Sequence, residues 1–113
     1  NCKAIILRNE QEIRKIIIDD VIFIQVEDYL LTFVLKCSDR FSCTKSLKEI
    51  ASNLPSSFFQ INRSCVVNLN EIRSIKRKQQ TILLSDSTEL PVSDRRMKLL
   101  INSLTDSTNA FTE

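Results

Sequence analysis

Glycine, histidine and tryptophan are absent from this chain of 113 residues, and proline occurs only twice. Histidine is the side chain that titrates near neutral pH, so its absence removes the commonest general base. Without glycine, the chain has neither a phosphate-binding loop that needs close backbone approach nor a Gly-x-Ser-x-Gly turn. Asp19 and Asp20 lie between two apolar runs, which is typical of a turn rather than of an acid–base pair. We therefore expect no enzymatic activity and no cofactor.

The four cysteines, Cys2, Cys37, Cys43 and Cys65, are scattered and form no Cys-x-x-Cys pair. Zinc sites normally use paired ligands at short spacing, so we expect no metal site. Cys37, Cys43 and Cys65 lie in largely apolar segments, where a free cysteine packs as a small hydrophobic residue. Reduced core thiols are typical of the cytoplasm, which is the compartment we expect.

Long apolar runs are absent too, since the longest have the length of a strand rather than the ~20 residues of a transmembrane helix. No signal peptide is visible, and we expect no membrane contact by this domain. The chain begins with Asn1 rather than methionine, from which we expect a piece of a longer protein with further segments upstream.

The net charge of +2 is small, but the charge is unevenly distributed. Residues 31–100 contain 12 basic and 6 acidic residues, whereas residues 1–30 contain 4 and 6, and residues 101–113 contain 2 acidic residues only. A local basic face favours a polyanionic partner, although a solvated surface of scattered lysines gives the same count. The densest basic run, Lys76-Arg77-Lys78, is interpreted as a solvated turn between two strands.

Short β-branched and aromatic runs, separated by Asp, Ser and Asn, predict one mostly β domain with antiparallel strands. Because glycine is absent, Asn, Asp and Ser must provide the positive φ that tight hairpins require. Turns are expected at Asp19-Asp20, Glu27-Asp28, Ser38-Asp39 and Ser85-Asp86-Ser87. The expected strands are Ala4–Leu7, Ile13–Ile18, Val21–Val26, Tyr29–Cys37, Arg40–Thr44, Phe58–Ile61, Cys65–Val67, Ile72–Ile75, Thr81–Leu84 and Leu90–Val92.

Two segments have helical periodicity. In the first, Ser46 and Glu49 match a capping box and Pro55 ends the run. In the second, Ser93 is the expected N-cap, and the buried face consists of Met97, Leu100, Ile101 and Leu104. Residues 105–113 are mostly polar and are expected to form a disordered tail, so the folded domain is expected to span residues 1–104.

Arginines occupy two positions that call for a partner. Asn62-Arg63-Ser64 interrupts two apolar runs, and the simplest arrangement puts it at an exposed strand end or loop. Arg95 and Arg96 lie in the first turn of the second helix, where the helix dipole disfavours cations. Each arginine either binds an external anion such as DNA or pairs with an internal carboxylate, for which Asp94 and Glu89 are the candidates beside Arg95.

Three blocks together resemble the signature of the LytTR DNA-binding domain, found in bacterial response regulators of the LytR/AlgR type. They are "FFQINRSCVVNLNEIRSI" at 58–75, "LPVSDRRMKLL" at 90–100 and "DVIFIQVEDYLLTFVL" at 20–35. Their order and spacing agree with the family, and the resemblance covers about residues 3–104. This chain departs from it at Asn62, where the family usually has histidine, and at Asp86-Ser87, where it usually has glycine.

This resemblance implies elongated, stacked antiparallel sheets with two short helices. It also implies sequence-specific binding of double-stranded DNA by the output domain of a two-component response regulator. Such domains insert loops into successive major grooves of paired half-sites, so a homodimer on DNA is expected. By position, the DNA-binding residues are expected to be Asp28, Tyr29, Lys45, Asn62, Arg63, Ser93, Arg95, Arg96 and Lys98.

Roles within this set follow from side-chain chemistry. Arg63 and Arg95 are the main candidates for base contacts, because arginine reads guanine with two parallel hydrogen bonds, and Asn62 and Tyr29 are further candidates. The residues expected to contact phosphates are Lys45, Ser93, Arg96 and Lys98. Two other functions stay open: a protein-interaction module with an exposed, apolar β edge, and an RNA-binding domain, which would use exposed aromatics such as Tyr29, Phe41 or Phe111.

Overall fold

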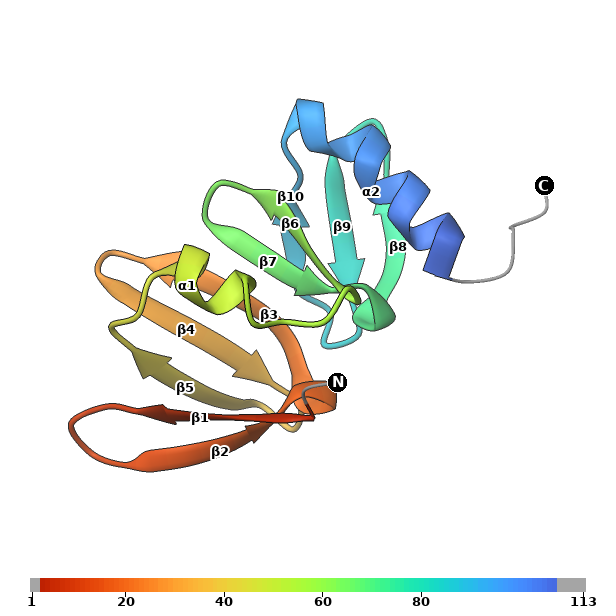
Figure 1. Cartoon of the computed structure of the whole chain (residues 1–113). Coiled ribbons are helices and arrows are strands. Elements are labelled where there is room, and N and C mark those ends of the chain that lie inside the picture. Colours follow the sequence, from red (N-terminus) through yellow and green to blue (C-terminus); the bar gives the residue numbers. More distant parts are fainter. Residues whose placement is uncertain (1–2, 108–113) are drawn as a thin grey trace.

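The computed structural model describes residues 3–107, which form a mostly β, elongated domain measuring 48 × 29 × 25 Å (Figure 1). The strands are β1 Ala4–Arg8, β2 Ile13–Ile17, β3 Val21–Glu27, β4 Leu30–Leu35, β5 Asp39–Cys43, β6 Phe58–Asn62, β7 Cys65–Asn68, β8 Ile72–Lys76, β9 Thr81–Leu84 and β10 Glu89–Pro91. The α-helices are α1 Leu47–Ala51 and α2 Asp94–Ser107, and two 3₁₀ turns are η1 Ile18–Asp20 and η2 Leu69–Glu71. Every strand predicted from the sequence is present, and the boundaries differ by about two residues at most.

Three antiparallel sheets build the domain around two core clusters. The central sheet has five strands in the order β5-β4-β3-β7-β6. A second sheet has three strands in the order β10-β9-β8, and the third is the hairpin β1-β2. Phe33 of β4 lies in one cluster, with β1, β2 and α1, whereas Val34 lies in the other, with β9 and α2. Both faces of the central sheet are therefore buried, which explains why β3 and β4 are almost continuously apolar.

Tight turns form without glycine. The residues with positive φ are Asp28 (56°), Cys37 (64°), Ser38 (58°), Gln80 (55°) and Ser87 (73°). Aspartate and serine were expected in this role, but cysteine and glutamine were not, and each pays the steric cost that a Cβ atom brings to the left-handed region. The prediction that Cys37 is a core residue is wrong, because it is exposed in the β4–β5 turn, whereas Cys43 and Cys65 are buried. Cys2 lies outside the described residues.

Both helices begin where the sequence predicts. The capping box at α1 is confirmed, since the Glu49 amide donates to the Ser46 hydroxyl and the Ser46 amide donates to the Glu49 carboxylate, both at 3.1 Å. Helix α2 packs Met97, Leu100 and Leu104 against the second cluster. It continues three residues beyond the predicted end, to Ser107, and residues 108–113 of the predicted tail lie outside the described residues.

Within residues 3–107, no helix is long and apolar enough to span a membrane. The same residues bring together no group of three or more acidic or cysteine side chains that could hold a metal ion.

Candidate nucleic-acid interface

Strand pairing brings three connecting segments to one end of the central sheet. Gln25 of β3 pairs with Cys65 of β7, so the β3–β4 turn lies beside the β6–β7 turn. Leu31 of β4 pairs with Cys43 of β5, so Lys45, which follows β5, lies at the same end. Figure 1 shows these connections along one edge of the molecule, with the start of α2 close by. A loop-based surface therefore forms from segments far apart in the sequence.

The start of α2 is fastened to β6 by hydrogen bonds. The Ser93 amide donates to the backbone oxygen of Ile61 at 2.9 Å, and Arg96 Nε donates to the backbone oxygen of Gln60 at 3.0 Å. An open hollow of about 480 Å³ lies between the two elements, and we call it the arginine hollow. Its lining residues are Gln60, Asn62, Arg63, Ser93, Arg95 and Arg96. Five of the nine residues predicted to bind DNA thus lie together.

Arg63 and Arg95 are exposed, and neither side chain makes a hydrogen bond or an ion pair with any residue that the structure describes. The carboxylates expected to compete for Arg95 are engaged elsewhere. Asp94 accepts a hydrogen bond from Gln80 at 2.7 Å, and Glu89 forms an ion pair with Lys76 at 3.1 Å, which lowers the pKa of Glu89. Two arginines therefore present their full hydrogen-bonding capacity to solvent at one hollow.

Arg96 is held differently. Its guanidinium carbon lies 4.9 Å from the centre of the Phe59 ring, in addition to the bond from Nε to Gln60. The terminal nitrogens have no partner among residues 3–107 and remain open to an anion. Asn62, by contrast, uses its side-chain amide within the protein, donating to the backbone oxygen of Pro91 at 2.8 Å.

The other predicted residues do not line the arginine hollow. Tyr29, at the tip of the β3–β4 turn, is 93% exposed, and it follows Asp28, whose positive φ forms that turn. Lys98 is exposed on α2, one turn after Arg95. Lys45 is exposed and lines a separate hollow of about 440 Å³.

Arg8 is a basic residue of this end that the sequence did not single out. It lines the same hollow as Lys45, is exposed and has no partner in the part of the chain that the structure describes. In the sequence it is an isolated cation at the end of a short strand. Its position is evident only once the β1–β2 hairpin is seen to reach Lys45.

The basic run Lys76-Arg77-Lys78 also adjoins this region. Arg77 and Lys78 lie in an exposed turn of residues 77–80, as predicted, whereas Lys76 is the half-buried last residue of β8 and pairs with Glu89. Gln80 connects it to α2, because its side chain donates to Asp94. This bond holds the Asp94 carboxylate, which does not line the arginine hollow.

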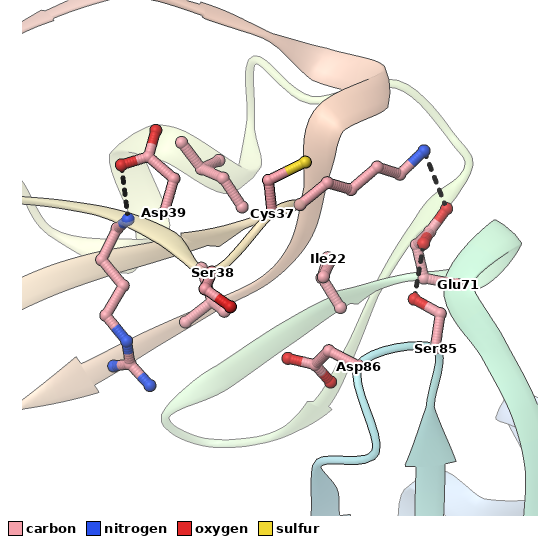
Figure 2. Close-up of a pocket in the computed structure, with 11 residues that line it drawn as sticks. Ile22, Cys37, Ser38, Asp39, Glu71, Ser85 and Asp86 are labelled. Atoms are coloured by element: carbon pink, nitrogen blue, oxygen red, sulfur yellow. Dashed lines mark hydrogen bonds and ion pairs between the residues drawn. The ribbon is translucent and has the colours of Figure 1, made fainter.

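A further hollow, of about 570 Å³, lies at the opposite end of the central sheet, between the β4–β5 and β9–β10 turns. Figure 2 shows Cys37, Asp39, Glu71 and Asp86 around it. Glu71 pairs with Lys36 at 3.5 Å and accepts a hydrogen bond from Ser85 at 2.7 Å. The three carboxylates of its lining, Asp39, Glu71 and Asp86, outnumber its two cations, Lys36 and Arg40, so this hollow is less suited to a polyanion than the arginine hollow.

Comparison with known proteins identifies the family and the fold of the chain. Residues 11–105 match the sequence model of the LytTr DNA-binding domain. No curated protein matches the chain. A solved structure with the same fold is the LytTr DNA-binding domain of a protein described as a methyl-accepting/DNA response regulator from Bacillus cereus, with a TM-score of 0.77 and 23% sequence identity. The match covers 92% of this chain and 98% of that one.

Proposed function

This chain belongs to the LytTR DNA-binding domain family, and we propose that it recognises a specific sequence in double-stranded DNA as the output domain of a two-component response regulator. The observation that carries this proposal is the arginine hollow, where the unpaired Arg63 and Arg95 lie beside the anchored Arg96. Arginine is the side chain best suited to both guanine edges and phosphates. A DNA target places this activity in the cytoplasm of a bacterium.

Exposure and anchoring assign the roles. Arg63 and Arg95 are free to enter a groove and read bases, because no internal bond holds them. Arg96 and Ser93 are tied to β6 and would contact phosphates, which set the register without reading sequence. Lys45 and Lys98 extend the phosphate contacts to either side, and Arg8 joins Lys45.

The β3–β4 turn supplies the remaining contact. Tyr29 would reach a base edge or a sugar from the tip of the turn, since almost all of its side chain is exposed. Asp28 would support it by holding the left-handed backbone conformation before it. Turns rather than a recognition helix therefore enter the major groove in this proposal. Two copies would occupy half-sites about 10 base pairs apart, as a dimer on DNA.

Selection from a random duplex pool by the purified chain tests this function directly. Enriched sequences are read at moderate and at raised salt. Two recurring half-sites about one helical turn apart, with retention that falls steeply as salt rises, are expected. If no sequence is enriched and the retention of duplex does not depend on salt, the proposal is overturned.

A protein-interaction module is the second candidate, and one observation favours it. Such a module needs an exposed apolar strip, and Ile6 (63% exposed), Ile13 (71%) and Ile17 (43%) provide one on the outer face of the β1–β2 hairpin. Substituting Ile6 and Ile13 with Ser, which is polar but uncharged and so adds no carboxylate beside Arg8 and Lys45, would leave duplex selection unchanged if DNA binding is the function.

RNA binding has less support, because a stacking platform needs several exposed aromatic rings. Phe41 is buried. Phe111 lies outside the described residues, which leaves Tyr29 of the three aromatic side chains considered.

A further inference from the structure

Asn62 lies where two segments of the proposed DNA-binding surface meet, and its side-chain amide bonds to both. Its Oδ1 accepts hydrogen bonds from the Ser64 amide at 2.9 Å and the Ser64 hydroxyl at 3.1 Å. Its Nδ2 donates to the backbone oxygen of Pro91, the last residue of β10, at 2.8 Å. One planar group therefore joins the β6–β7 turn, which carries Arg63, to the segment that leads into α2.

These bonds use the groups that base reading would require. An asparagine that reads adenine accepts from N6 through Oδ1 and donates to N7 through Nδ2. The amide oxygen has two lone pairs, and the two bonds from Ser64 occupy both. Reading adenine through both Oδ1 and Nδ2 would therefore break contacts that shape the turn itself. This differs from the expectation, drawn from the sequence, that Asn62 contacts a base.

The neighbouring residues of β6 are fastened to the same segment. The backbone oxygen of Gln60 accepts from Arg96, and that of Ile61 accepts from the Ser93 amide. Asn62 continues this series by one residue, to the point where the strand ends and the turn begins. Gln60 and Ile61 take part through backbone oxygens, whereas Asn62 takes part through its side chain, so a substitution at Asn62 removes the β6 partner itself.

We propose that Asn62 is a positioning residue, which sets the β6–β7 turn carrying Arg63 relative to the helix start carrying Arg95 and reads no base itself. This inference rests on the proposed function. A pair of arginines that is preformed at a fixed spacing loses less conformational freedom on binding than two independently moving loops. The fixed spacing also selects DNA sites in which the two contacted bases have the matching separation.

The test compares Asn62→Ala with Asn70→Ala, a control in which an exposed asparagine of η2 is replaced at the opposite end of the sheet. The duplex is the sequence that the unaltered chain selects. Asn62→Ala should lower affinity about tenfold, from the ordering cost of the freed turn, and leave the ranking of bases at every position and the salt slope unchanged. Asn70→Ala should bind as the unaltered chain does.

A double-mutant cycle on DNA affinity distinguishes the positioning role from a merely structural one, which would give the same loss of affinity with and without Arg63. In an Arg63→Ala background, Asn62→Ala should cost about twofold or less, because the turn no longer carries the side chain to be positioned. If Asn62→Ala instead relaxed the sequence preference at a single base pair, Asn62 would be contacting that base and the inference would be overturned. Equal losses in both backgrounds, or affinity unchanged by Asn62→Ala, would equally overturn the inference.

Two further measurements distinguish failure of this inference from misfolding of the variant and from failure of the proposed function. Hydrogen exchange at the Ser64 amide in the free chain should accelerate in Asn62→Ala and not in Asn70→Ala, and unchanged exchange would contradict the inference. If Asn62→Ala does not fold, Ser64→Ala removes one of the three bonds and should lower affinity in the same way, by a smaller factor. Absence of any selected duplex for the unaltered chain would instead overturn the proposed function.

Discussion

The guanidinium of Arg96 stacks 4.9 Å from the centre of the Phe59 ring, while its Nε donates to the backbone of Gln60. Phe59 packs in turn against the second core cluster, which also contains Leu100 of α2. One surface arginine is thus held by a strand and its core rather than by a carboxylate. A cation that is oriented without being neutralised keeps its charge for an external anion.

Arg96 should therefore contribute both to stability and to DNA binding. Arg96→Lys keeps the charge but loses the stacked plane and the Nε donor, so the free energy of unfolding should fall by about 1–2 kcal/mol. Urea denaturation measures this change. Arg95→Lys is the matched control, since Arg95 is exposed and has no partner within residues 3–107, and it should unfold at the urea concentration of the unaltered chain. Equal stability of the two variants would contradict the anchoring role.

Arg95 and Lys98, one turn apart on α2, should affect DNA binding in different ways. Arg95→Ala should cost about 1–3 kcal/mol on the selected duplex and relax the preference at one base pair, because a bidentate contact is lost. Lys98→Ala should weaken binding to all sequences alike and reduce the salt slope by about 1. Binding titrations with single-base variants of the duplex at several salt concentrations distinguish them. Uniform losses for both variants would show that Arg95 contacts phosphate only.

The strands were predictable from the sequence, because short β-branched and aromatic runs and the turn-forming residues between them mark each strand locally. The left-handed conformations of Cys37 and Gln80 were not, since neither residue type favours them. Each occurs in a turn between two strands whose buried residues fix the register, so core packing imposes the turn geometry. The exposure of Cys37 follows from the same constraint.

The candidate site was predictable in its residues more than in its contacts. Resemblance and unusual charge placement both pointed to Arg63 and Arg95. The sequence left internal carboxylates open as partners, because the direction of the Asp94 side chain depends on Gln80, which is distant in sequence and near in space. Arg8 was missed for the same reason, as only the packing of the β1–β2 hairpin brings it to Lys45.

Thiol modification should distinguish the three described cysteines. Cys37 is exposed in a turn, whereas Cys43 and Cys65 are buried. A short pulse of maleimide at neutral pH should label Cys37 and leave Cys43 and Cys65 unmodified until the chain is unfolded in urea. Peptide mass spectrometry assigns the label to each residue and separates these three from Cys2. Early labelling of Cys43 or Cys65 would show that the core opens at that end of the sheet.

Cys65 should also make the stability of the domain depend on alkaline pH. Burial raises the pKa of its thiol to about 12, because the thiolate would lose its solvation in the core. In the unfolded chain the thiol ionises near its ordinary pKa of about 8.5–9. Between these two values the folded state holds more protons than the unfolded state, so the free energy of unfolding falls as pH rises.

The loss attributable to Cys65 should be negligible at pH 7 and reach about 1–2 kcal/mol at pH 10, relative to pH 7. Urea denaturation at intervals from pH 7 to 10 measures it. The informative quantity is the difference between the profiles of the unaltered chain and of Cys65→Ala, because contributions common to both chains cancel. The variant should be less stable at pH 7, because it leaves a cavity, and should lose less stability as pH rises. Parallel profiles would show that the thiolate of Cys65 is accommodated in the folded state, through local opening where β7 begins beside the β6–β7 turn.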